Sequence, residues 1–95
     1  MLLHTINKSP YDHRALRSCI QFCSAGDAIV LLEDGVYGVT HQDLQQSALE
    51  DIKLFAVQGD LLARGLPDPQ TERIQIITYD TFVALCVDYP RIKSW

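Results

Sequence analysis

The three cysteines are the residues of this chain with the most specific potential chemistry. A thiolate can act as a nucleophile, carry sulfur or bind a metal ion. Cys19 and Cys23 are four residues apart, a spacing that puts both thiols on one face of a helix, whereas Cys86 lies far along the chain. The spacing therefore leaves two interpretations, a reactive or metal-binding pair and a pair of packed apolar residues.

The sequence around the pair favours packing. Leu16, Cys19, Ile20 and Cys23 repeat at helical spacing and form an apolar stripe. Cys19 lies beyond the first helical turn, where the helix dipole helps a thiolate little, and no second ligand pair of the kind that zinc requires stands nearby in the sequence. We expect Cys23 and Cys86 in the core, no metal site and no cofactor. Cys19 remains the candidate catalytic residue.

Other polar residues give weaker signals. Glu33 and Asp34 are suited to acid–base work, but Gly35 follows them directly, which favours a turn. No histidine has a serine, cysteine or acidic neighbour in a recognised catalytic arrangement. We expect all three to be surface or hydrogen-bonded residues: His4, His13 and His41.

Short apolar runs between helical patterns predict the elements that position these residues. The expected strands cover residues 2–6, 28–32, 53–57 and 74–78. One helix should begin at Ser9 and Pro10 and end at Gly26, and Asp80 should cap a helix that Pro90 ends. The other expected helices are a weak one over residues 41–51 and a short one over residues 59–65.

This alternation of strands and helices predicts an α/β fold with a small, parallel, four-stranded sheet and helices on both faces. Ligands collect at the carboxyl ends of the strands in such sheets. Glu33, Asp34, Gly35 and Tyr37 follow the second strand and should lie at that edge.

Length and composition limit the functional classes. Ninety-five residues predict one domain, residues 1–95, and 47% hydrophobic residues against 21% charged ones exceed what a small monomer easily buries. That surplus favours an oligomer or a permanent complex. A net charge of −4 disfavours direct contact with nucleic acid or anionic membranes.

The first residues lack the apolar stretch of a signal peptide, and no run reaches membrane-spanning length. An odd number of cysteines without an export signal favours reduced thiols over a disulfide framework. We therefore expect a cytoplasmic protein.

Four segments together, LHTINKSP, LLEDGVYG, LFAVQGDLLARGL and the closing SW, resemble the TusB and DsrH family. The likeness covers essentially the whole chain. It implies a DsrE-like, flavodoxin-like α/β/α sandwich. It also implies a heterohexamer in which TusC- and TusD-like subunits, or DsrF- and DsrE-like subunits, accompany this chain.

Such complexes carry sulfur as a cysteine persulfide and pass it to a TusE-like or DsrC-like acceptor protein. In the Tus branch the sulfur reaches the wobble uridine of certain tRNAs, which becomes 2-thiolated. In the Dsr branch the complex serves dissimilatory sulfur oxidation. We favour the Tus branch because it is the more widespread.

In both branches the principal persulfide cysteine belongs to the partner subunit. This chain is then mainly structural, a non-catalytic or auxiliary subunit of a sulfurtransferase complex. DsrH-type members, however, resemble the segment SCIQF and carry a cysteine at the position of Cys19, seven residues before Gly26. The resemblance thus implies Cys19 as an auxiliary persulfide site.

Overall fold

The structure is a computed structural model that describes residues 1–45, 49–69 and 72–95. Its strands are β1 (Leu2–Ile6), β2 (Ala28–Leu31), β3 (Lys53–Val57), β4 (Ile74–Ile77) and β5 (Arg91–Ser94). In the described residues the α-helices are α1 (Ala15–Phe22), α2 (Gln58–Ala63) and α3 (Tyr79–Asp88), and the 3₁₀ helices include η1 (Glu33–Thr40) and η2 (Gln42–Gln45).

Across the described part of the chain, the sheet has five parallel strands in the order β4-β3-β2-β1-β5, so the predicted parallel α/β architecture is confirmed but the number four is wrong. The missed strand β5 pairs with β1, with Leu3 beside Ile92. Its sequence, RIKS, lacks an apolar run because it is an edge strand and mostly exposed. Charged residues on an edge strand oppose unwanted pairing, and here they also hide the strand from pattern analysis.

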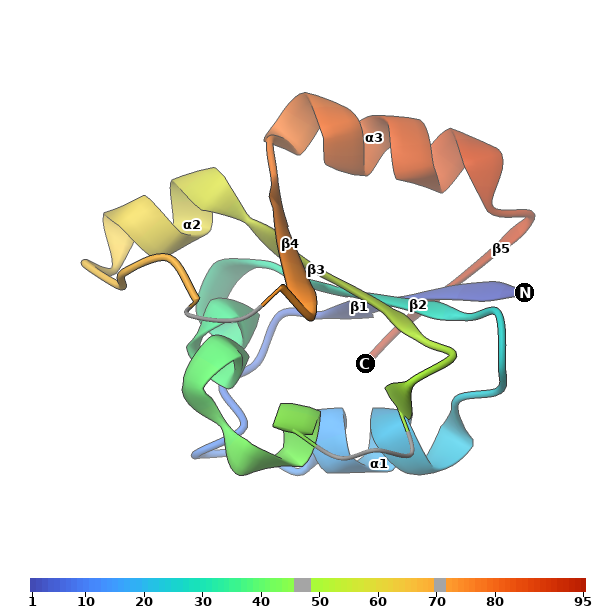
Figure 1. The fold of residues 1–95 in the computed structure, drawn as a ribbon, viewed down its shortest axis with the longest axis horizontal. Helices are drawn as coiled ribbons and strands as arrows, with labels where there is room; N and C mark the ends of the chain where they lie inside the picture. Colours follow the sequence, from blue (N-terminus) through green and yellow to red (C-terminus); the bar gives the residue numbers. More distant parts are fainter. Residues whose placement is uncertain (46–48, 70–71) are drawn as a thin grey trace.

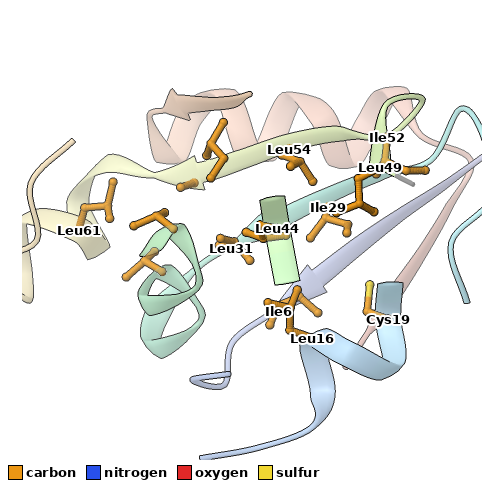
Figure 2. Close-up of a cluster of buried hydrophobic side chains, with 14 residues drawn as sticks. Ile6, Leu16, Cys19, Ile29, Leu31, Leu44, Leu49, Ile52, Leu54 and Leu61 are labelled. Atoms are coloured by element: carbon orange, nitrogen blue, oxygen red, sulfur yellow. The ribbon is translucent and has the colours of Figure 1, made fainter. Parts of the chain in front are cut away.

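Helices cover both faces of the sheet, as expected (Figure 1). The face of the sheet that α1, η1 and η2 cover holds the larger core cluster, in which Ile6, Leu16 and Ile29 are completely buried. Figure 2 shows this cluster, with the Cys19 sulfur at its edge. The opposite face holds Leu3, Val30 and Phe55 beneath α3.

Two predicted helix starts are wrong. Ser9 and Pro10 form a turn in which the Ser9 carbonyl accepts from the backbone N–H of Asp12 and His13, and α1 begins later, at Ala15. Helix α1 also ends at Phe22 rather than at Gly26, whose φ is +91°.

The N-terminal cap of α3 also differs from the prediction. The cap is Thr78, whose hydroxyl accepts from the Thr81 N–H, in place of the predicted Asp80.

The predicted helix over residues 41–51 is not seen as an α-helix in the described residues, where η2 and residue 49 are in 3₁₀ conformation; residues 46–48 lie outside the described part of the chain. No helix within residues 1–45, 49–69 and 72–95 is long and apolar enough to span a membrane.

Candidate functional site

The two cysteines of α1 lie side by side, as their spacing predicted. Their Sγ atoms are 3.9 Å apart. Cys19 is completely buried in the core below β1 and β2, whereas Cys23, at the end of α1, is only partly buried. The thiol that sequence reasoning singled out is therefore the less accessible one.

The contact between the two thiols separates their acidities. The hydrogen bond with Cys19 stabilises a thiolate at Cys23 and lowers the pKa of Cys23 below its ordinary value, although burial opposes this. The same contact raises the pKa of Cys19, and burial raises it further. Cys23 is thus the first of the pair to ionise, with the Cys19 S–H as its donor.

His4 extends this pair into a cluster. Its side chain, on β1, is completely buried, and one ring nitrogen lies within 4.8 Å of both cysteine sulfurs. Nε2 contacts Asp27 Oδ2 at 2.9 Å, and Nδ1 accepts a hydrogen bond of 3.1 Å from Trp95 Nε1. Because an indole N–H can only donate, Nδ1 carries the lone pair and Nε2 carries the proton.

Asp27 fixes the chain around His4. Its carboxylate accepts from the backbone N–H of Leu2 and Ser24 as well as from His4 Nε2. Burial alone would raise the pKa of Asp27, but these three hydrogen bonds outweigh it and lower the pKa. A buried carboxylate with three donors holds β1, β2 and the end of α1 in one arrangement.

Aromatic rings close the cluster on the side of β5. Phe22 and Trp95 both lie against the His4 imidazole, at centroid distances of 6.0 and 6.1 Å. Lys93 Nζ stands 4.7 Å from the centre of the Trp95 ring. Beyond Phe22 and Asp27, a surface cleft of about 740 Å³ opens toward solvent.

The carboxyl edge of the sheet, where the sequence predicted function, is a separate region. An open cleft of about 460 Å³ lies there, with Glu33, Asp60 and Tyr79 among its lining residues. The carboxylates of this region make hydrogen bonds that connect neighbouring segments: Asp60 accepts from the Glu33 N–H, and Asp34 accepts from Arg64 Nε. Glu33 and Asp34 begin η1, in agreement with the interpretation that they serve the turn.

The other sequence candidates do not join the cluster. Cys86, on α3, packs against the opposite face of the sheet. His41 Nδ1 accepts from the Asp43 N–H, and His13 is exposed beside α1. Sequence reasoning missed Asp27 and Trp95 because hydrogen bonds between distant segments leave no periodic signal.

Alkylation rates will test the order of thiol reactivity. In a brief treatment of the reduced protein with iodoacetamide at neutral pH, we expect Cys23 to be modified well before Cys19, because Cys23 is both more exposed and more acidic. Peptide mass spectrometry would read the order, with Cys86 as an internal reference. Faster modification of Cys19 than of Cys23 would contradict the burial described here.

Comparisons with known proteins give one consistent family. Residues 8–92 match the family model described as DsrH like protein. The chain is 34% identical to Protein TusB of Pectobacterium atrosepticum over 100 residues and 36% identical to Protein TusB of Escherichia coli strain K12 over 98 residues. Each alignment covers 99% of this chain and 100% of the relative.

A solved structure agrees with the fold. The solution structure of protein Tm0979 from Thermotoga maritima superposes with a TM-score of 0.71 at 27% identity, and 93% of each chain is covered. The full-length identity and the family match together show that the chain belongs to the DsrH-like family, with relatives named TusB.

Proposed function

We propose that this chain is a mainly structural subunit of a TusBCD-type sulfur relay complex. The observation that carries the proposal is the full-length similarity to proteins named TusB. The complex would be a cytoplasmic heterohexamer with TusC- and TusD-like subunits. It would pass persulfide sulfur to a TusE-like acceptor and on toward 2-thiolation of the tRNA wobble uridine.

The outer face of α3 supports a role in assembly. Tyr79, Val83 and Val87 follow one another at intervals of four residues and are all exposed. Apolar side chains at this spacing form one stripe along a helix. A protein partner that covers this stripe would bury the apolar surplus that the composition predicts.

The burial of Cys19 supports the structural role. A sulfur carrier must present its thiol to a donor and an acceptor, and Cys19 is completely buried with a raised pKa. In a second candidate function, the chain is the DsrH subunit of a DsrEFH complex in sulfur oxidation, with Cys19 as an auxiliary persulfide site. The description of the matched family as DsrH-like favours this alternative.

Co-expression with the two adjacent homologous subunits would test both candidates. We expect a heterohexamer in native mass spectrometry and, after loading with radiolabelled sulfur, label on the partner's cysteine alone. Label that is also on this chain, and that Cys19→Ser removes while Cys86→Ser does not, would support the auxiliary site instead. A chain that stays monomeric beside its neighbours would overturn the relay proposal.

A charge placed on α3 should prevent assembly. Val87 is 79% exposed, so Val87→Glu should leave the isolated chain folded but break the contact of the stripe with a partner. We expect at least a tenfold loss of co-purified partner, with unchanged circular dichroism. Leu62→Glu is the matched control, because Leu62 is 70% exposed on α2. An equal loss from both variants would exclude α3 as the specific contact.

A further inference from the structure

The cluster of His4, Cys19 and Cys23 combines three potential metal ligands, one from β1 and two from the second half and the end of α1. One ligand atom from each residue lies within 4.8 Å of the other two. We propose that these three residues form a binding site for a thiophilic divalent cation of the zinc class, with one coordination position left open. The proposal is independent of the sulfur relay, because it rests only on this cluster.

The separation of the two sulfurs suits such an ion. In a tetrahedral site with Zn–S bonds of about 2.3 Å, two thiolate sulfurs lie roughly 3.8 Å apart. The Sγ atoms of Cys19 and Cys23 are 3.9 Å apart. A zinc-bound imidazole nitrogen would lie roughly 3.6 Å from each sulfur. The His4 ring nitrogen that lies within 4.8 Å of both sulfurs would therefore approach them by about 1.2 Å at most.

The surroundings of His4 provide a second, independent observation. Metal-binding histidines usually donate their other ring N–H to a carboxylate, which fixes the tautomer and orients the ring. His4 Nε2 has this partner in Asp27, at 2.9 Å. Nδ1 holds the lone pair and now accepts from Trp95 Nε1. We assign Nδ1 as the ligand, so a bound ion takes the place of the Trp95 N–H.

The charges of the site balance. A divalent cation displaces one proton from each thiol of Cys19 and Cys23, and both protons pass to solvent while neutral His4 contributes its lone pair. Two thiolates and one divalent cation have no net charge, so binding adds no net charge to that of the buried Asp27 carboxylate beside His4. The cleft beside Phe22 and Asp27 is lined by two side chains that contact His4 directly.

Cobalt titration would test the site directly. The protein, reduced and stripped with a chelator, would be titrated with Co²⁺, whose thiolate bonds give a near-ultraviolet charge-transfer band, and then with Zn²⁺ in competition. We expect one ion per chain and displacement of Co²⁺ by Zn²⁺. Trp95 is the single tryptophan, so a change of its fluorescence should accompany binding. Absence of the cobalt band in the native chain would overturn the proposal.

Variants would identify the ligands. Cys23→Ser and His4→Gln should each weaken Co²⁺ binding by at least tenfold, and circular dichroism would show that each variant is folded. The matched controls are Cys86→Ser and His13→Gln, which lie outside the cluster and should bind as the native chain does. An equal loss in Cys86→Ser and Cys23→Ser would mean adventitious binding to thiols and would overturn the site.

Trp95 gives a test that also works if His4→Gln fails to fold. Trp95→Phe keeps an aromatic ring but removes the N–H that competes for His4 Nδ1. We expect this variant to bind Co²⁺ severalfold more tightly than the native chain. Unchanged or weaker binding would contradict the assignment of Nδ1 as a ligand.

Discussion

Gly35→Ala is expected to destabilise the folded protein by more than about 3 kcal/mol. At this position η1 crosses the end of β1 so closely that a Cβ atom on Gly35 would overlap the carbonyl oxygen of Ile6. That oxygen cannot move away freely, because it accepts the Leu32 N–H at 3.0 Å. The overlap is with backbone, so a change of side-chain rotamer cannot relieve it.

Urea unfolding followed by circular dichroism would measure the loss. Gly59→Ala is the matched control, because a Cβ on Gly59 has no neighbour within 4 Å and the residue lies in α2. We expect that variant to be as stable as the native chain or more stable, by up to about 1 kcal/mol. Equal midpoints for the two variants would show that η1 does not pass Ile6 this closely.

Asp27→Ala is the second change with a large expected effect, a loss of about 3 kcal/mol of unfolding free energy. It leaves three donors without their acceptor, the N–H groups of Leu2 and Ser24 and the Nε2–H of His4. Asp34→Ala is the control: Asp34 is an exposed partner of Arg64, and its loss should cost less than about 1 kcal/mol. Urea unfolding of the metal-free protein would compare the two, and similar losses would contradict the role given to Asp27.

The contribution of Asp27 should also depend on pH. Because folding lowers the pKa of this carboxyl, the folded state is favoured above the unfolded-state pKa of about 3.9, and the gain disappears as pH falls through the lower folded-state pKa. The stability difference between the native chain and Asp27→Asn should therefore narrow in acid. Urea midpoints measured from neutral to acid pH would show this, and a constant difference would contradict it.

The interior strands could be predicted closely from the sequence. The runs that became β2 and β3 are apolar except for the exposed Lys53 at the start of β3, because parallel strands are covered on both faces. By contrast, β5 was missed and the cap of α3 was assigned to Asp80 instead of Thr78. An exposed edge strand has no apolar run, and a helix cap depends on one or two hydrogen bonds, so both leave only a faint pattern in the sequence.

The helical repeat by itself placed Cys19 and Cys23 on one face of α1, because residues four apart must meet on a helix. It could not show which thiol is exposed, nor that one ionises more readily. The sequence also determined the family, through segments spread along the whole chain.

Only the tertiary structure brought His4, Asp27 and Trp95 to the two thiols. Packing of α1 beneath β1, the start of β2 and the pairing of β5 with β1 each supply one of these side chains. The physical reason is that periodicity records which face of an element is buried. Which side chains come into contact on that face depends on the register of the strands and on how whole elements cross, and no local sequence pattern encodes either.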